Sequence, residues 1–166
     1  MTIQTLTQEL LKIEFNYNQN TGIFTRLLSG HGTKKGDVAK NKSSNGYITI
    51  TIFSKKYSVH RLAWLYMTGS WPKEQIDHIN GIRDDNRWIN LRECTQQQNQ
   101  FNSFKNKNNT SGYKGVYYHK ESNKWYSQAG LNNKKIYLGS YEKKEEAYNA
   151  YIEFSKLNHG NYFKQI

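Results

Sequence analysis

The sequence predicts an α+β protein made of two small domains. Short alternating strand patterns and short helical stripes occur in both halves of the chain, which is typical of that fold class. Between the halves, Gln96 to Asn109 is a run dominated by Gln and Asn. A chain of 166 residues has room for one ordinary domain or two small ones. We therefore expect a first domain over 1–102, a basic polar linker over 103–110 and a second domain over 111–166.

Charge and composition narrow the functional classes. The chain has 24 Lys and Arg against 13 Asp and Glu, a net charge of +11, which predicts a polyanionic partner such as nucleic acid or an anionic membrane surface. No apolar run reaches the ~20 residues of a membrane span, and the first residues lack a signal core, so we expect a cytoplasmic protein with no membrane association. The single Cys94 excludes an internal disulfide or a Cys-rich zinc site. Aromatic residues make up 14%, which disfavours disorder.

The first domain should begin as a small antiparallel strand region and continue into a buried helix. The expected elements are a helix over 7–13, strands over 23–27 and 46–53, a turn over 54–56, a strand that resumes at Tyr57, and a helix over 62–67 that ends at Gly69. We expect the hydrophobic core of this domain to contain Leu62, Trp64, Leu65, Ile76, Ile89, Leu91 and Cys94.

The Gln- and Asn-rich segment from Gln96 to Asn109 should start as a helix and end as a linker. Thr95 and Gln98 have the spacing of a capping box, which predicts a helix start. No acidic residue occurs between Glu93 and Glu121, so Lys105 and Lys107 could lie along a phosphate backbone. The alternative is a solvated linker that contacts nothing.

The second domain should be a three-stranded antiparallel sheet packed on one helix. We expect strands over 116–119, 125–131 and 134–138, with a turn at Asn132–Asn133, and a helix over 142–157. The helix carries an apolar stripe formed by Ala147, Ala150, Tyr151 and Phe154. This stripe should cover the apolar sheet face, which comprises Val116, Tyr118, Trp125, Ser127, Ala129, Ile136 and Leu138.

The opposite sheet face interleaves amines with aromatic rings. Its residues are Tyr117, His119, Tyr126, Gln128, Lys135 and Tyr137. Such a sheet can enter a major groove, where lysines meet phosphates and Gln128 or His119 meets base edges. The alternative is that the tyrosines only stiffen the sheet.

Four segments of this domain together resemble the AP2 DNA-binding domain. They are Ser111–Val116, Lys124–Ser127, Tyr137–Tyr141 and Glu145–Tyr151. The resemblance implies a sheet that lies in the major groove, with DNA facing Lys114, Tyr117, His119, Gln128, Gly130, Lys135 and Tyr137. Plant members have arginine at the positions of Tyr117, His119 and Gly130, so their target preference does not transfer.

The residues best suited to catalysis lie in the middle of the chain. Asp77 and His78 end a predicted strand and enter a tight Asn80–Gly81 turn, so their side chains can serve one site from opposite sides. An Asp oxygen suits Mg²⁺ or Mn²⁺, and a neutral His can take a proton from water. The amide oxygen of Asn99 could be a second hard ligand. Taken singly, Asp77–His78 could be a turn-opening pair and Asn99 a helix-surface residue.

Together these residues resemble the HNH nuclease family. The Asp77–His78 pair, the Asp85–Arg92 segment and the Thr95–Asn99 helix start occur in the family's order, and His60–Trp64 resembles phage and intron-encoded homing endonucleases. The resemblance implies a ββα-metal core over about 57–102. It also implies that His78 is the general base, that Asp77 and Asn99 hold one divalent ion, and that Asn90 orients His78.

The family resemblance leaves some details open. Asn99 stands where the motif ends in His, which favours Mg²⁺ or Mn²⁺ over zinc. His60 could contact a phosphate or be hydrogen-bonded inside the fold. Arg61, Arg87 and Arg92 are candidate phosphate ligands, although each could pair with Asp84, Asp85 or Glu93.

The sequence therefore predicts a homing-type, metal-dependent endonuclease that nicks or cuts double-stranded DNA, in the host cytoplasm if a phage encodes it. We expect no protein partner, and one metal site favours a monomer. The alternative is a DNA-binding or transcription-regulatory module with an inactive nuclease fold. An RNA-binding protein is disfavoured, because an A-form major groove is too narrow for the sheet.

Overall fold

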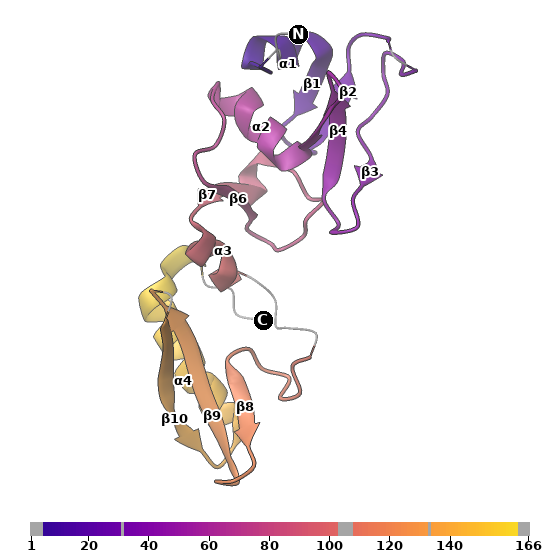
Figure 1. The fold of residues 1–166 in the computed structure, drawn as a ribbon. Helices are drawn as coiled ribbons and strands as arrows, with labels where there is room; N and C mark the ends of the chain where they lie inside the picture. The colour runs from indigo at the N-terminus through magenta and orange to yellow at the C-terminus, as the bar shows by residue number, and fades with distance from the viewer. Residues whose placement is uncertain (1–4, 31, 103–107, 133, 163–166) are drawn as a thin grey trace. The chain divides into compact units, whose positions relative to one another are not determined.

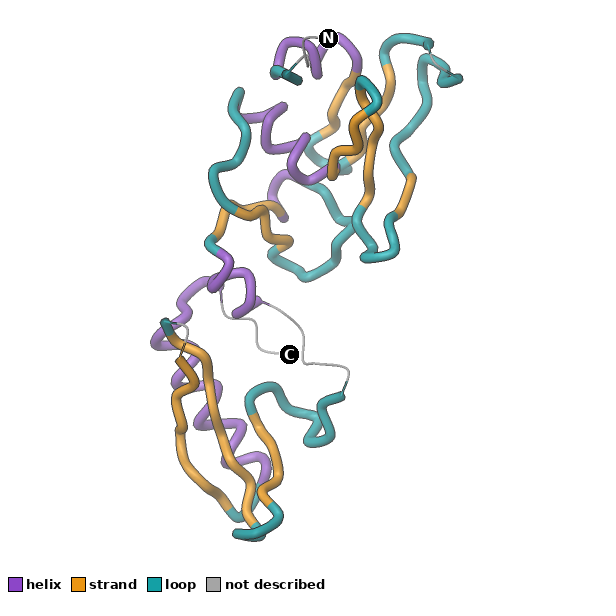
Figure 2. The backbone as a smooth tube through the Cα atoms, viewed as in Figure 1, coloured by secondary structure: helices purple, strands orange, loops and turns teal. Residues whose placement is uncertain are grey.

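A computed structural model of the chain describes residues 5–30, 32–102, 108–132 and 134–162, which fall into two compact units, 1–94 and 95–166. Figure 1 labels most of the helices and strands, and Figure 2 shows that each unit combines both kinds of element. The observed fold class is α+β, as the sequence predicts. Within the described residues, no helix is both long and apolar enough to span a membrane.

The described part of the first unit contains three small antiparallel sheets and two α-helices. Helix α1 (Gln8–Glu14) leads into the β1–β2 hairpin, and a second sheet has the strand order β3-β4-β5. Helix α2 follows, and the β6–β7 hairpin closes the unit with the short 3-10 helix η1 in its loop. The bounds are β1 Phe15–Asn18, β2 Ile23–Arg26, β3 Asn41–Lys42, β4 Ile48–Ile52, β5 Lys55–Ser58, α2 Val59–Thr68, β6 Gln75–His78, η1 Trp88–Asn90 and β7 Leu91–Cys94.

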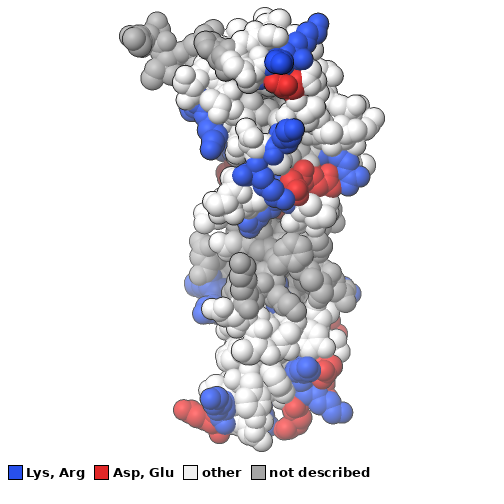
Figure 3. Space-filling model, turned by 90° about the vertical axis from the view of Figure 1, so that its right-hand side faces the viewer, with Lys and Arg blue, Asp and Glu red and all other residues white. Residues whose placement is uncertain are grey.

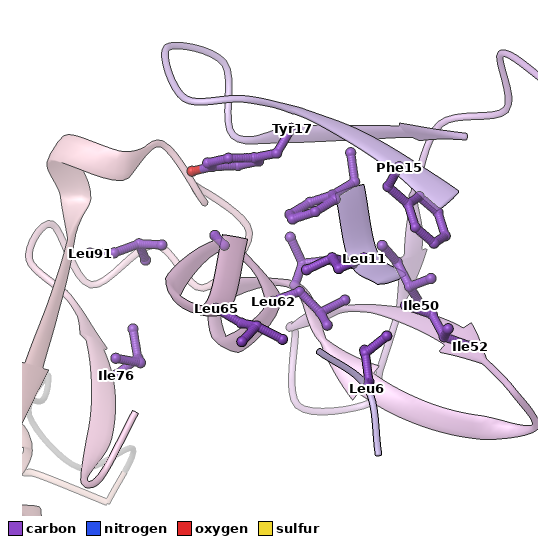
Figure 4. Packing of buried hydrophobic residues seen from close by; sticks show 13 residues of the cluster. Leu6, Leu11, Phe15, Tyr17, Ile50, Ile52, Leu62, Leu65, Ile76 and Leu91 are labelled. Atoms are coloured by element: carbon purple, nitrogen blue, oxygen red, sulfur yellow. The ribbon is translucent and has the colours of Figure 1, made fainter. Parts of the chain in front are cut away.

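Helix α2 is the centre of the core in this unit. Its buried residues Leu62, Ala63 and Leu65 pack with apolar side chains from α1, the two sheets and the β6–β7 hairpin (Figure 4). Leu62, Leu65, Ile76 and Leu91 are in this core, Trp64 packs against it, and Cys94 is buried, as predicted. Ile89 is a wrong prediction, because its side chain is 83% exposed. The 3-10 turn instead directs Trp88 inward, where its ring lies 5.3 Å from that of Trp64.

Two boundaries in the first unit differ from the predictions. The β4–β5 turn is formed by Phe53 and Ser54, both with positive φ, so Lys55 and Lys56 lie on a strand rather than in the turn. Helix α2 begins at Val59, before the predicted start at Leu62, and the preceding Ser58 has extended backbone angles. It ends as predicted at Gly69, which adopts the left-handed conformation with φ 81°.

The second unit begins with helix α3 (Gln96–Asn102) and the predicted capping box. Thr95 Oγ1 accepts from the Gln98 backbone N–H at 3.2 Å, and Gln98 Oε1 accepts from the Thr95 N–H at 2.8 Å. The first-domain limit at 102 remains a prediction, since the compact units divide after Cys94 and α3 packs against the 3-10 helix η2 (Gly160–Tyr162). The predicted DNA contacts Lys105 and Lys107 lie outside the described residues.

The rest of this unit is the predicted three-stranded sheet on one helix. The strand order is β10-β9-β8, with β8 Val116–His119, β9 Lys124–Leu131 and β10 Lys134–Tyr141. Strand β10 runs beyond the predicted Leu138, because a register shift between Tyr137 and Gly139 lets pairing resume up to Tyr141. Helix α4 (Lys144–His159) covers one sheet face with the buried Ala147 and Tyr151. Asn132 has φ 50°, as a tight hairpin turn requires, and Asn133 lies outside the described residues.

Candidate active site and nucleic-acid interface

The β6–β7 hairpin places Asp77 and His78 side by side at the start of a long loop. Asp77 pairs with Arg92 in the strand register, and His78 pairs with Leu91. The Gly81 N–H donates to the His78 carbonyl at 2.7 Å, which forms the predicted tight turn. Both side chains are buried, so their chemistry is set by a few fixed neighbours rather than by bulk water.

Asn90 holds the loop between the two strands. Its Oδ1 accepts from the Asn80 backbone N–H at 2.9 Å, and its Nδ2 donates to Asn80 Oδ1 at 3.0 Å and to the Asp85 carbonyl at 2.7 Å. The Asn90 side chain bonds no atom of His78 in these contacts. These bonds brace the loop, and the role of Asn90 in orienting His78 remains a prediction.

The partner of His78 is Asn86, a residue that the sequence analysis did not single out. Asn86 is 2% exposed, and its Oδ1 lies 3.1 Å from His78 Nε2. Its Nδ2 donates to the Asp84 carbonyl at 3.2 Å, which leaves Oδ1 to face the imidazole. An amide oxygen can only accept, so His78 carries its proton on Nε2 and its lone pair on Nδ1.

The β1–β2 hairpin fixes the backbone of Asn86. The Tyr17 hydroxyl donates to the Asn86 carbonyl at 2.7 Å, and the Trp88 N–H donates to the Gln19 carbonyl at 2.9 Å. Gly22 lies so close that a Cβ there would be 2.4 Å from the Asn86 carbonyl carbon. Tyr17, Gln19 and Gly22 are far from His78 in the sequence. The predicted turn that contains Gly22 was the only feature of this hairpin that the sequence indicated.

The electrostatics of the site keep His78 neutral. Burial lowers its pKa from the ordinary 6.5, opposed in part by the Asn86 hydrogen bond and by the carboxylates of Asp77, Asp85 and Asp84. The Arg87 guanidinium, which donates to both oxygens of Asp85, holds the pKa of that carboxyl at about 2. A neutral imidazole is the form of the ring that can accept a proton.

Asp77 is held by a bidentate contact from Arg92. The Nε and Nη2 atoms of Arg92 lie 2.9 and 2.7 Å from Asp77 Oδ2. Sequence reasoning expected Arg92 to contact phosphate or to pair with Asp84, Asp85 or Glu93, and the pairing with Asp77 was not foreseen. In the described part of the chain, no three His, Cys, Asp or Glu side chains cluster as metal ligands.

His60 packs against the other side of the His78 ring. The two ring centroids are 5.2 Å apart in a T-shaped contact, and the Tyr47 ring lies 5.0 Å from His60. Burial, reinforced by His78 and Arg61, lowers the pKa of His60 to about 3. Its Nδ1 is buried without a hydrogen-bond partner among the described residues. The structure therefore places His60 inside the fold, behind His78.

The other predicted arginines are also engaged. Arg61 donates to the carbonyls of Glu74 at 3.3 Å and Pro72 at 3.5 Å, in the segment that leads into β6. Arg87 pairs with Asp85 at 2.6 Å, one of the partners that the sequence analysis had allowed. Roles for these side chains on phosphate remain predictions.

Asn99 and Lys114 both belong to the second unit. Asn99 lies in the first turn of α3, as predicted, and its backbone N–H donates to the Thr95 carbonyl at 3.0 Å. The Lys114 ammonium donates to the carbonyls of Gln100 at 3.2 Å and Phe101 at 2.9 Å, near the end of α3. Burial lowers the pKa of Lys114 to about 8. Lys114 therefore caps this helix, and a DNA contact by it remains a prediction.

The sheet face away from α4 carries the remaining predicted DNA contacts. Register places Tyr117 opposite Tyr126, and Gln128 opposite Tyr137. We call this surface the outer face; it comprises Tyr117, His119, Tyr126, Gln128, Lys135 and Tyr137.

Lysine and arginine side chains lie beside carboxylates in each unit on the side of the molecule seen in Figure 3. Ion pairs such as Lys42–Asp84 at 2.7 Å and Lys124–Glu142 at 3.2 Å offset part of the positive charge locally.

Comparison with family models assigns both parts of the chain. Residues 57–101 match the family of HNH endonucleases, and residues 111–161 match the AP2 domain. The chain carries an HNH endonuclease domain followed by an AP2 domain. No curated protein and no solved structure matches the chain.

The two matches cover the sites described above. The HNH match runs from β5 through α3 and contains Asp77, His78, Asn90 and Asn99. The AP2 match contains the whole three-stranded sheet and α4. Both domains bind DNA, which supports double-stranded DNA as the partner. The β1–β2 hairpin that holds Asn86 lies outside the HNH match, so the family pattern alone could not reveal it.

Proposed function

We propose that this protein is a homing-type, metal-dependent endonuclease that hydrolyses a phosphodiester bond of double-stranded DNA. The observation that carries the proposal is the His78 imidazole, buried, neutral and fixed by Asn86, next to the Asp77 carboxylate in an HNH domain.

His78 acts as the general base. With its proton on Nε2 bonded to Asn86 Oδ1, its Nδ1 takes a proton from the attacking water. Burial favours the neutral ring, so the base is present at neutral pH. As Nδ1 gains the proton, the Asn86 bond to Nε2–H strengthens, because the ring becomes cationic.

Asp77 and Asn99 are the residues that we propose to hold one divalent ion, Mg²⁺ or Mn²⁺. Their carboxylate and amide oxygens are hard donors, in keeping with that choice. When bound, such an ion stabilises the charge that develops on the scissile phosphate and on the leaving 3′ oxygen. Arg92 orients the Asp77 carboxylate, and Asn90 and Asn86 position His78 through the loop.

The AP2 domain binds the target duplex in this proposal. Its outer face enters the major groove, and lysines contact phosphates. A monomer with one metal site makes one cut at a time, so we propose a nick that leaves a 5′ phosphate.

A plasmid assay tests the proposal. Supercoiled plasmids that carry host or phage DNA are incubated with the protein and Mg²⁺ or Mn²⁺, with EDTA as control, and nicked and linear products are resolved. Metal-dependent nicked circles are the expected result. Linear product from single hits would contradict the single-cut monomer but would support the nuclease.

The second candidate is a DNA-binding or regulatory module with an inactive nuclease fold, which the AP2 match also supports. Tight, salt-sensitive binding without cleavage of any DNA would favour this candidate and would contradict the proposed endonuclease.

A further inference from the structure

The aromatic rings on the outer face form one continuous cluster across the three strands. Tyr126 on the central strand is in the middle: its ring centroid lies 4.6 Å from that of His119, 5.7 Å from Tyr117 and 5.4 Å from Tyr137. The His119 and Tyr126 rings are parallel to within 10°, and the other two contacts are tilted. This packing holds the rings in place before any ligand arrives.

The cluster leaves apolar ring surface open to solvent on both outer strands. Tyr137 on β10 is 57% exposed, and Tyr117 on β8 is 38% exposed. Near the β9–β10 turn, Gly130 adds no side chain to the face, and a Cβ there would meet nothing within 4 Å among the described residues. Apolar area held open on a basic sheet is a binding surface, because burying it against a ligand is favourable.

Gln128 adds a hydrogen-bonding group next to these rings. It is half-buried and directly opposite Tyr137 in the register. Its backbone N–H donates to the Gly115 carbonyl at 2.8 Å, whereas its side-chain amide has no hydrogen bond within the described residues. The amide therefore keeps both its donor and its acceptor for a ligand.

The second unit contains no arginine. All five arginines of the chain, Arg26, Arg61, Arg83, Arg87 and Arg92, precede residue 95. Arginine or lysine contacts to guanine O6 and N7 are the commonest specific contacts in the major groove, and only arginine presents a rigid planar fork to these two atoms. Lysines such as Lys135 bind as point charges without a fixed fork, which suits phosphates. Because it has no arginine, the second unit cannot bind guanine through a guanidinium fork.

The side chains on the outer face instead suit the A·T base pair. A Gln amide forms two hydrogen bonds with adenine N6 and N7, and apolar side-chain surface contacts the thymine methyl group. We infer that the outer face recognises A·T base pairs in the major groove, with Gln128 on adenine and the rings of Tyr117 and Tyr137 on thymine methyl groups. This inference rests on the proposed function only in taking duplex DNA as the ligand.

Binding experiments in EDTA, where no metal-dependent cleavage occurs, test the inference on the full chain. Duplexes that bind are selected from a random pool and sequenced, and the best duplex is then made with every thymine replaced by uracil. We expect A·T-rich selected sites, and about tenfold weaker binding of the uracil duplex, which lacks only the methyl groups. Because this probe alters the DNA and not the protein, folding of a variant cannot confuse the result.

Two variants sharpen the test. Gln128→Ala should relax selection at one A·T position of the selected site while selection at the other positions is kept, a pattern that general destabilisation would not give. Tyr137→Ala should abolish the difference between thymine and uracil duplexes. Tyr118→Ala is the matched control, since Tyr118 is an exposed tyrosine on the helix-side face of the same sheet, and it should keep that difference.

Selected sites rich in G·C, or equal binding of thymine and uracil duplexes, would overturn the inference and leave the proposed endonuclease intact. Failure to bind any duplex would overturn both. Tighter binding to single strands than to any duplex would overturn the inference too, and would show that the rings stack on unpaired bases.

Discussion

Asn90 and Gln128 carry the same functional group in two very different settings. Asn90 is 6% exposed and makes three hydrogen bonds within its loop, whereas the amide of Gln128 stands on a sheet face with no side-chain hydrogen bond among the described residues. The difference follows from the two tasks. Proton transfer needs groups held in one geometry, which buried hydrogen bonds provide, and base recognition needs donors and acceptors left for the ligand.

The largest expected effect separates chemistry from binding. His78→Ala removes the base and should lower the cleavage rate by about 10²- to 10⁴-fold. DNA affinity in EDTA should stay within about twofold, because the outer face is untouched. Lys135→Ala serves as the opposite control, with weakened binding and an intact site. Normal cleavage by His78→Ala would refute the assignment of the base.

Two glycines test how tightly each region is built. Gly22→Ala puts a methyl group 2.4 Å from the Asn86 backbone at a residue with φ +74°, and should lower the free energy of unfolding by about 3 kcal/mol. Gly130→Ala on the outer face meets open space and should change it by less than about 0.5 kcal/mol. Thermal or urea unfolding measures both. Equal effects would contradict the contrast between the two regions.

The buried histidine pair predicts acid sensitivity of the first unit. The pKa of His60 is about 3 in the folded protein and 6.5 when unfolded, so the unfolded state binds the proton more readily. The stability that this group contributes is complete above pH 6.5 and is lost as the pH falls from 6.5 towards 3. Between pH 6.5 and 5 the loss should be about 2 kcal/mol, since each pH unit is worth about 1.4 kcal/mol. His78 acts in the same direction.

Unfolding curves of metal-free protein at several pH values measure this effect. His60→Phe should reduce the dependence on pH, because it removes one of the two titrating rings and keeps an aromatic ring against Tyr47 and His78. An unchanged pH dependence in that variant would show that His60 is not the source.

The smallest expected effect concerns a single phosphate contact. Lys135→Ala should weaken binding of all DNA sequences to a similar extent and should reduce the slope of log affinity against log salt by about 1. Titrations at several salt concentrations measure the slope. A loss confined to one DNA sequence would show that Lys135 contacts a base instead.

Local patterns in the sequence were sufficient for most of the fold. The Thr95–Gln98 capping box, the Gly69 helix end and the three strands of the second unit are set by residues that are neighbours along the chain, and the structure has each of them. The apolar stripe of α4 and its cover of the sheet also follow from spacing alone. Ile89 and several element boundaries were exceptions, and at Ile89 a 3-10 turn changes the side on which an alternating pattern would place the residue.

The sequence by itself determined the two domains, the residues suited to chemistry and the net positive charge that predicts a polyanionic partner. It did so because motif spacing and composition are properties of the chain. Only the tertiary structure decided the partners of those residues: Asn86 for His78, Arg92 for Asp77, and Tyr17 and Gly22 for the loop. These contacts join segments separated by up to 69 positions. Packing in three dimensions selects such partners, and no local rule contains that information.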